Sequence, residues 1–374
     1  MHLPWCVRKC RYCDFNSWAW RGQDLTRTVD ALLAEARVRA EGLRPQTVFV
    51  GGGTPSLLPA DELARLLDGL QTITGFRDSA VEATMEANPE SLDADTARAA
   101  HEGGIDRLSI GVQSLRADVL AAYDRVHSAD DALAAFATAR EAGFARINLD
   151  LIYAFPGQTP DEWQADLQRV LALEPEHLSC YELSYEPGTA LTRLRDAGRW
   201  QPADVDRCLH LFQLTAAMCA ERGLRAYEVS AYARDDETCR HNLAYWRSLD
   251  HVGIGAGAVS WRRGERRRAL SDPAAWAADP LATEEVERPD AETRLFDHLM
   301  MGLRLRDEGV LLARAERQSG LDPRAHYAER LPALLERELL ECVVSPEGER
   351  LRATARGLEM LDGVLQDLLP SSAV

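Results

Sequence analysis

Apolar residues follow two alternating periodicities along the first 232 residues of the chain. Short, nearly continuous apolar runs rich in β-branched residues predict strands, and longer segments with apolar residues about three or four positions apart predict amphipathic helices. The predicted strands span residues 47–50, 81–86, 106–110, 146–152, 177–181 and 226–229. The predicted helices span residues 24–42, 59–70, 93–102, 129–142, 161–173 and 203–222.

This regular alternation of strand and helix is typical of a parallel sheet covered by helices. About six to eight such βα units can close into a complete or partial barrel. We therefore predict an α/β fold built on a partial (β/α)6, TIM-like barrel, with ligand sites at the carboxyl ends of its strands. An open doubly wound sheet is the alternative, although the glycines at 51–53 lack the G-x-G-x-x-G pattern of its dinucleotide site.

The pattern changes after residue 232, which suggests three parts: a barrel over 1–232, a connecting segment over 233–288 and an end domain over 289–374. The connecting segment contains a glycine-rich run and an arginine run at 262–268, which predicts a solvated hairpin or loop. Helices at 293–305 and 321–336 and a hairpin near 342–349 predict a small C-terminal α+β domain of the winged-helix type.

Charge and composition exclude several classes of function. A formal net charge of −17 and a pI near 5.0 argue against nucleic acid or an anionic membrane as a partner. The sequence has no secretory signal and no apolar run long enough to cross a bilayer, so a cytoplasmic location is expected. Eight cysteines in 374 residues are too sparse for a secreted disulfide scaffold. Five of them lie beyond residue 13 with no regular spacing, and of these Cys180, Cys208, Cys219 and Cys342 are expected in the core.

The other three cysteines, Cys6, Cys10 and Cys13, lie within one short segment near the N-terminus. Three thiolates at this spacing can wrap one compact iron–sulfur cluster. A [4Fe-4S] cluster has four irons and normally takes four cysteines, so three leave one iron open to a cofactor or substrate.

Two other interpretations of the cysteines remain. At positions i, i+4 and i+7 they would share one face of a helix and could be core residues, although Pro4 and the charged residues between them disfavour a helix. A structural zinc ion would need a fourth ligand, for which His2 is the nearby candidate. We favour the cluster.

The glycine turn Gly51-Gly52-Gly53-Thr54-Pro55 ends a predicted strand, where glycine lets a ligand approach the backbone closely. A triple glycine alone is often only a turn. Together with three cysteines in the first loop of a βα series, it resembles the radical S-adenosylmethionine (SAM) superfamily. That resemblance implies a [4Fe-4S] cluster held by the three cysteines, with SAM chelating the fourth iron and its amine end lying at the glycine turn.

The similarity extends over essentially the whole chain to the anaerobic coproporphyrinogen III oxidase-like family, which includes haem chaperones. The matching stretches include His2-Leu3-Pro4-Trp5-Cys6, Glu86-Ala87-Asn88-Pro89 and 109–114. By this resemblance, the expected SAM contacts are Gly52, Gly53, Thr54, Glu86, Gln113, Arg125 and Asp150. Acidic and amide groups can form hydrogen bonds with ribose hydroxyls and with the edge of adenine, and an arginine can form an ion pair with a carboxylate.

Two features separate chaperones from oxidases within this family. Oxidases carry a fourth cysteine two residues after the third, and Phe15 stands at that position here. Residues 239–246 resemble the H-N-x-x-Y-W motif of the chaperones. They offer side chains for iron and for a porphyrin face, with the iron ligand left open: Cys239, His241, Asn242, Tyr245 and Trp246. The plain alternative is a loop whose aromatic residues pack on the barrel and whose histidine is hydrogen-bonded.

We therefore expect a protein that binds haem and transfers it to acceptor haem proteins, such as membrane respiratory enzymes. The rivals are an oxygen-independent coproporphyrinogen III oxidase and a radical enzyme acting on an unrelated substrate. Whether SAM is cleaved or only bound is left open, and a homodimer formed through the cluster region is a further hypothesis.

Family members also carry a strand ahead of the H-x-P-x-C element, with a tyrosine two residues before its histidine. Met1 directly precedes His2 here, so either the start codon is misassigned or the first strand is truncated. A true truncation would weaken the cofactor pocket and the edge of the barrel.

Overall fold

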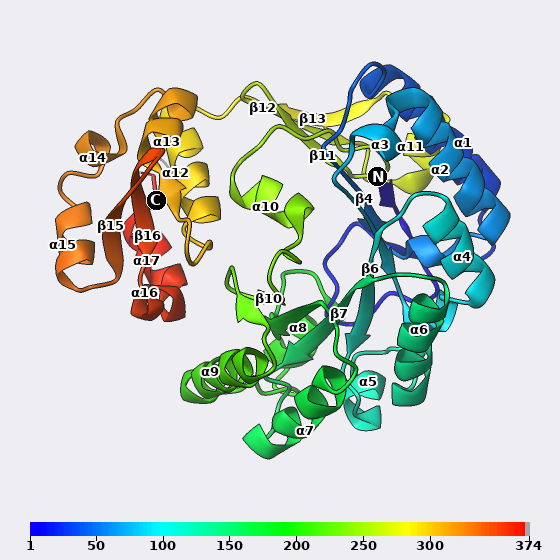
Figure 1. Cartoon of the computed structure of the whole chain (residues 1–374), viewed down its shortest axis with the longest axis horizontal. Helices are drawn as coiled ribbons and strands as arrows, with labels where there is room; N and C mark the ends of the chain where they lie inside the picture. The colour runs from blue at the N-terminus through cyan, green and yellow to red at the C-terminus, as the bar shows by residue number, and fades with distance from the viewer. Residues whose placement is uncertain (371–374) are drawn as a thin grey trace.

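An eight-stranded sheet organises the computed structural model of the chain, which describes residues 1–370 (Figure 1). Six of its strands run parallel in the order β1-β4-β5-β6-β7-β8, which confirms the predicted partial barrel. These strands are β1 (His2–Leu3), β4 (Thr47–Gly52), β5 (Glu82–Ala87), β6 (Arg107–Gln113), β7 (Arg146–Tyr153) and β8 (His177–Glu182). The edge strand β1 has two residues, which pair with Gly51 and Gly52.

Helices cover the outer face of the sheet, as Figure 1 shows. Side chains alternate along each strand, so that in β5 Ala83, Met85 and Ala87 pack in the core under the helices. The intervening residues face the inside of the barrel. The covering helices are α1 (Leu25–Arg39), α2 (Ala60–Thr74), α3 (Phe76–Ser79), α4 (Ala94–Glu102), α5 (Ala117–Ala122), α6 (Ala129–Glu141), α7 (Pro160–Leu171), α8 (Ala190–Asp196) and α9 (Val205–Glu221).

The sheet ends differently from the prediction of a single strand at 226–229. Two short strands, β9 (Arg225–Ala226) and β10 (Ala231–Ala233), pair antiparallel, and β10 runs antiparallel to β8. The chain turns between them because the Glu228 carboxylate accepts a hydrogen bond from the Ser230 N–H at 2.8 Å. A side chain that satisfies the backbone locally favours a turn over a continuing strand.

The connecting segment packs across the open edge of the barrel. The arginine run forms the predicted hairpin, as part of a three-stranded sheet of β11 (Val259–Arg262), β12 (Glu265–Ala269) and β13 (Thr283–Glu287). Helix α11 (Pro273–Ala278) follows this hairpin and contacts α1. A side chain at Gly255 would place its Cβ 2.1 Å from the His2 carbonyl oxygen, so the glycine-rich run lies directly against β1.

The C-terminal part has its own core and a three-stranded sheet in the order β14-β16-β15. The predicted helix at 321–336 is wrong, because two short helices replace it, each with a proline in its first turn, Pro323 and Pro332. The elements are α12 (Ala291–Gly302), β14 (Val310–Leu311), α13 (Leu312–Ser319), α14 (Pro323–His326), α15 (Leu331–Glu336), β15 (Leu340–Ser345), β16 (Gly348–Ala353), α16 (Ala355–Glu359) and α17 (Leu361–Asp367). Cys342 is exposed on β15, contrary to the expectation of a core position.

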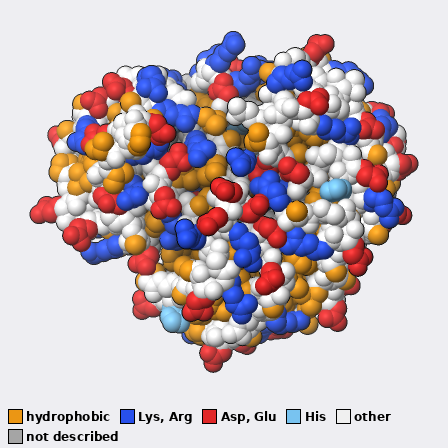
Figure 2. All heavy atoms as spheres, viewed as in Figure 1, with side chains coloured by type: hydrophobic (Ala, Val, Ile, Leu, Met, Phe, Trp, Pro, Cys, Tyr) orange, Lys and Arg blue, Asp and Glu red, His pale blue; other side chains and the backbone are white. Residues whose placement is uncertain are grey.

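The surface carries acidic and basic side chains mixed together, and Figure 2 shows them interspersed over one whole face. The excess of acidic residues therefore does not form one large acidic patch on that face. Within residues 1–370, no helix combines the length and the apolar character that a membrane crossing requires.

Candidate functional site

Cys6 ends β2 (Trp5–Cys6), and Cys10 and Cys13 lie in the loop that leads from it to β3 (Trp18–Ala19), a short strand that pairs with β2. We call residues 6–17 the cysteine loop. Cys6 is buried, Cys10 and Cys13 are half-buried, and all three thiols are free of disulfides. The loop closes on itself where the Cys13 N–H donates to the Cys10 carbonyl at 3.3 Å. A helix through the three cysteines, one of the alternatives, is therefore absent from this described segment.

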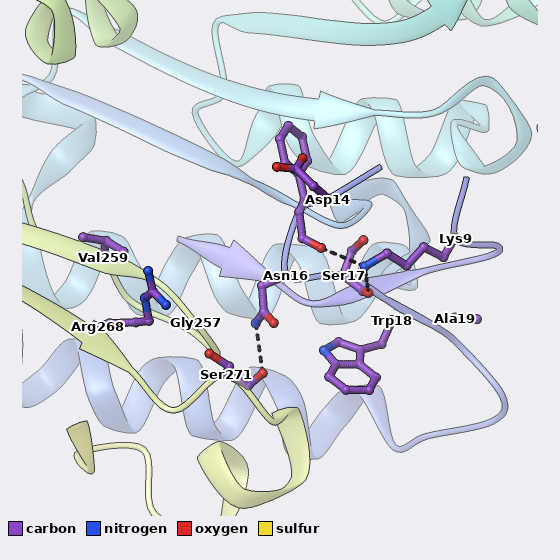
Figure 3. Close-up of a pocket in the computed structure, with 11 residues that line it drawn as sticks. Lys9, Asp14, Asn16, Ser17, Trp18, Ala19, Gly257, Val259, Arg268 and Ser271 are labelled. Atoms are coloured by element: carbon purple, nitrogen blue, oxygen red, sulfur yellow. Dashed lines mark hydrogen bonds between the residues drawn. The ribbon is translucent and has the colours of Figure 1, made fainter. Parts of the chain in front are cut away.

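Lys9 holds the second half of this loop in place. Its ammonium group donates to the carbonyl oxygens of Phe15 at 2.9 Å and Ser17 at 3.0 Å (Figure 3). These residues line a hollow of about 570 Å³ between the loop and the β11–β12 hairpin. Phe15, which stands where an oxidase has its fourth cysteine, is 59% exposed at this hollow.

The cysteine thiols influence one another electrostatically. The pKa of Cys6 is raised to about 11, mainly by burial and also by charge on Cys13 and Cys10. Burial is also the main cause that raises the pKa of Cys13. Two neighbouring thiols with raised pKa values, Cys6 and Cys13, fit a positively charged metal centre, which would stabilise their thiolate forms. Across residues 1–370, no three His, Cys, Asp or Glu side chains converge tightly enough for a single metal ion.

Arg125 connects the cysteine loop to the barrel and is 5% exposed at its side chain. Its guanidinium donates to the Cys10 sulfur at 3.5 Å, to the Asn88 side-chain oxygen at 2.8 Å and to the Gly111 carbonyl at 2.7 Å. Most of its five donors are therefore engaged within the protein. The resemblance predicts that Arg125 pairs with the carboxylate of SAM. In the structure it also holds Cys10 in place.

The glycine turn packs tightly against the N-terminal strands. The N–H groups of Gly51, Gly52, Gly53 and Thr54 all donate within the protein, and that of Gly52 donates to the Glu86 carboxylate at 2.8 Å. A ligand approaching this backbone therefore meets carbonyl oxygens, which accept hydrogen bonds from an ammonium group. The absence of side chains serves internal packing as well, because a Cβ on Gly52 would meet the His2 ring at 2.6 Å.

Two carboxylates face each other inside the barrel next to this turn. The pKa of Glu86 is raised to about 7, mainly by burial and also by the charge of Asp150, while the hydrogen bond from the Gly52 N–H acts to lower it. Asp150 lies within β7 rather than after it, and accepts hydrogen bonds from Ser109 and Asn148 at 2.9 Å each. A positively charged ligand between Glu86 and Asp150 would restore their full ionisation.

Hydrogen bonds join the remaining predicted contacts into the same site. Buried Thr54 accepts from the Asn88 side chain at 2.8 Å, and Asn88 in turn accepts from Arg125. Gln113 ends β6 with a left-handed backbone (φ 66°), which turns the chain at the register shift beside β7. The structure thus brings six of the seven predicted SAM contacts to the carboxyl ends of β4 to β6 and the cysteine loop, and the seventh, Asp150, lies deeper in the barrel, where its charge acts on Glu86.

The candidate haem residues lie at the other end of the strands, on and just before helix α10 (Arg240–Trp246). Glu82, the first residue of β5, accepts from the backbone N–H groups of Arg240 at 3.0 Å and His241 at 2.9 Å. Cys239 is fully buried, and its thiol donates to the same carboxylate at 3.5 Å. Cys239 therefore points into the protein rather than toward an open ligand site.

His241 is also engaged within the protein. One ring nitrogen lies 2.8 Å from the Thr47 hydroxyl and the other 3.3 Å from the Tyr245 hydroxyl, and the ring stacks on Phe49 at 5.0 Å. Burial lowers the pKa of His241 to about 4. The imidazole is thus neutral at physiological pH, which is the form that ligates iron.

The other residues of this motif are partly exposed to solvent. None of the seven residues of α10 is buried, so Asn242, Tyr245 and Trp246 are half-exposed. The Tyr245 ring contacts His251 edge-on at 4.6 Å, and the Arg304 guanidinium lies 4.8 Å from the centre of the Trp246 ring. Figure 1 shows α10 between the barrel and the C-terminal part, so these aromatic side chains lie where the two parts meet.

The sequence did not predict the residues that hold the cysteine loop against the glycine-rich run and the segment that follows β12. Asn16 donates to the carbonyl oxygens of Ala256 at 3.0 Å and Ser271 at 2.9 Å, the second of which Figure 3 shows. His2 lies 2.9 Å from the Asn16 carbonyl. The available signal was the repeated glycine between 253 and 257, which is typical of a close backbone approach.

Comparison with known proteins places this geometry in a family. Residues 1–170 match the model of the radical SAM superfamily, and residues 290–360 match that of the HemN C-terminal domain. Over 381 residues the chain is 35% identical to the heme chaperone HemW of Mycobacterium tuberculosis, covering 99% of this chain and 94% of that protein. The chain belongs to the HemW family of the radical SAM superfamily.

Other relatives are similar over much or nearly all of the chain. The chain is 39% identical to the heme chaperone HemW of Escherichia coli over 264 residues, which cover 69% of this chain and 68% of that protein. It is 33% identical to the mitochondrial radical S-adenosyl methionine domain-containing protein 1 of mouse, covering 99% and 86% of the two chains. The solved structure of coproporphyrinogen III oxidase HemN from E. coli superposes with a TM-score of 0.80 at 23% identity, covering 98% of this chain and 88% of that one, and confirms the fold.

Proposed function

We propose that this protein is a haem chaperone: it binds haem and transfers it to acceptor haem proteins, and it carries a [4Fe-4S] cluster on Cys6, Cys10 and Cys13. The observation that carries the proposal is the division of the barrel into two ends. The cysteine loop and the candidate SAM contacts occupy the carboxyl ends of the strands, and half-exposed Tyr245 and Trp246 occupy the amino ends. A cargo can therefore bind without displacing the cluster.

Each group at the cluster end has a distinct task in this proposal. A bound cluster with SAM supplies one-electron chemistry at the sulfonium bond. The carbonyl oxygens of the glycine turn and the carboxylates of Glu86 and Asp150 receive the positive end of the cofactor. Arg125 holds the Cys10 thiolate and positions the cysteine loop against β6.

At the opposite end, α10 offers flat aromatic surfaces and a neutral imidazole. The names of the relatives support haem as the cargo, because the chain shares 35% identity with a heme chaperone over 99% of its length. For His241 to ligate iron, its ring must exchange one of its two present contacts, with Thr47 or Tyr245, for the metal. Because the contact with Tyr245 is the longer one, the nitrogen facing Tyr245 is the proposed iron ligand.

The test is a haem titration, followed by absorbance, of the anaerobically reconstituted protein and of its His241→Ala variant. The exposed His210 on α9 gives a matched control, His210→Ala. We expect stoichiometric binding by the wild type and the control and at least tenfold weaker binding by His241→Ala. Haem transfer to an acceptor haem protein and turnover of coproporphyrinogen III are measured on the same samples. Decarboxylation of coproporphyrinogen without specific haem binding would overturn the proposal in favour of the oxidase.

A further inference from the structure

One aromatic side chain on the inner face of the barrel is open to solvent. Tyr181 lies near the carboxyl end of β8 and is 43% exposed. It follows Ser179 by two residues, so the two side chains lie on the same face of the strand. Ser179 donates to the Asn148 side chain at 3.0 Å, and Asn148 donates to Asp150, so this face lines the inside of the barrel. His177 and Ser179 are buried on it, and the interior therefore opens at Tyr181, toward the carboxyl ends of the strands.

Carboxylates lie around this exposed ring. Ser179 pairs with Asp150 of β7 in the sheet, so Tyr181 lies one strand away from that carboxylate and two residues closer to the carboxyl end. The pKa of Tyr181 is raised, mainly by burial and also by the negative charges of Asp150, Glu228 and Glu86. Side chains from β7, from the turn between β9 and β10 and from β5 are therefore close enough to act on the phenol. Because its pKa is raised, the phenol is neutral at physiological pH.

The cations nearby do not fully neutralise these three carboxylates. Positive charges on Arg107, Arg304 and the Met1 ammonium act on Asp150, Glu228 and Glu86, in that order. Burial nevertheless leaves the pKa of all three carboxylates raised. A cationic ligand in the open space beside them would favour their ionised forms.

We propose that the ring of Tyr181 binds the sulfonium group of SAM and gives the site a preference for this cation over the neutral thioether S-adenosylhomocysteine. The inference deepens the proposed function, since it rests on SAM as the cofactor of the cluster end and not on haem binding. A cation over the face of a tyrosine ring is attracted by the ring's quadrupole, and the attraction grows where water is excluded. None of the SAM contacts expected from the sequence comes from β8, so Tyr181 adds the last parallel strand of the barrel to that site.

The experiment measures binding of SAM and of S-adenosylhomocysteine to the anaerobically reconstituted protein by equilibrium dialysis. The two ligands share the amine, the carboxylate and the adenosine, and differ in the charge on sulfur. We expect the wild type to bind SAM about fivefold more tightly or better. Tyr181→Phe keeps the ring and should keep this ratio, whereas Tyr181→Leu should lower the ratio by about threefold or more through weaker SAM binding.

Tyr185→Leu is the matched control, because Tyr185 packs in a separate apolar cluster and accepts a hydrogen bond from Trp200 at 3.2 Å. This variant should bind both ligands with the wild-type ratio. A general loss of structure would weaken both ligands together and would lower the urea midpoint, so each variant is also unfolded in urea.

Three results would overturn the inference. The first is a wild-type ratio in Tyr181→Leu, and the second is an equal loss in Tyr181→Phe and Tyr181→Leu, which would assign the effect to the hydroxyl. The third is equal binding of the two ligands by the wild type, which decides the matter even if no Tyr181 variant folds. Haem titration of the same wild-type sample keeps the two proposals apart, because failure to bind haem overturns the chaperone function and leaves the preference for SAM standing.

Discussion

At the scale of single residues, close backbone approaches explain why glycine is required beside the cluster loop. A Cβ on Gly53 would lie 2.6 Å from the Trp5 carbonyl oxygen and 2.8 Å from that of Leu3. The Gly53 N–H donates to the Leu3 carbonyl at 2.6 Å, so the two segments cannot separate without losing this bond. Because Trp5 directly precedes Cys6, the spacing at Gly53 also fixes where the first cysteine of the loop lies.

Gly53→Ala is therefore expected to lower the free energy of unfolding by about 1–3 kcal/mol, the usual cost of overpacking, and to reduce iron incorporation. The measurements are urea unfolding and iron content after reconstitution. Gly363→Ala is the matched control, because Gly363 lies within α17 and has open space around it. The control should be neutral or stabilising by about 0.4–1 kcal/mol. Equal effects at both positions would contradict the packing argument.

At the scale of elements, one carboxylate fixes helix α10 on the amino ends of the strands. Glu82 accepts the first backbone N–H groups of the helix, and its negative charge suits the positive end of the helix dipole. Burial by itself raises the pKa of Glu82, but the Arg240 N–H and the Arg107 charge outweigh it, and the net result is a lowered pKa. Since α10 carries the candidate haem residues, the position of Glu82 controls the geometry of that site.

Because the pKa of Glu82 is lowered in the folded state, its contribution is present above the pKa of an unfolded glutamate, about 4.3, and is lost as the pH falls below it. Glu82→Gln should therefore destabilise the protein near pH 7 by about 1–3 kcal/mol and leave a shallower acid dependence of stability. Urea unfolding between about pH 3 and 7 measures both effects. Glu341→Gln, at a half-exposed carboxylate of the C-terminal hairpin, is the control and should leave the acid dependence nearly unchanged. An unaltered acid slope in Glu82→Gln would contradict this account.

At the scale of the whole molecule, the barrel and the C-terminal part have separate cores, and polar contacts cross between them. Arg247, which follows α10, pairs with Glu308 of the C-terminal part at 2.7 Å, and Gln213 of α9 donates to Glu359 at 2.7 Å. The Trp246 ring stacks with Arg304 across the same boundary. The face of α10 that carries the candidate haem residues thus lies at the junction of the two cores.

Arg247→Met should loosen this junction without changing either core. The side chains of Arg247 and Glu308 are 39% and 29% exposed, so after solvent screening the pair contributes less than about 1 kcal/mol. We expect limited proteolysis between residues 285 and 290 to accelerate by up to about fivefold, which corresponds to that free energy. Arg337→Met breaks an ion pair inside the C-terminal part and should leave the cleavage rate unchanged. Equal acceleration in both variants would contradict a role of Arg247 at the junction.

The sequence by itself determined the repeating βα order and the barrel that follows from it. Its signals are local: apolar runs mark strands, spaced apolar residues mark helices, and residues such as Thr159 or Asp93 cap helices with their own side chains. The cysteine spacing and the glycine turn also predicted a cluster site from the sequence, because such a site is formed by residues that lie close together in one short segment. The failures near residues 226–231 and 321–336 arose where a side-chain bond or a proline interrupted an apolar pattern.

Only the tertiary structure decided which groups meet across the barrel. Residues 82 and 239 are distant in the chain, yet the carboxylate of Glu82 receives the thiol of Cys239 and the start of α10. The same holds for Arg125 with Cys10 and for Asn16 with the glycine-rich run. Periodicity reports which face of an element is buried, but not which element covers it. The pairing of Arg125 with Cys10 follows from how the strands are brought together, which is why no local pattern could predict it.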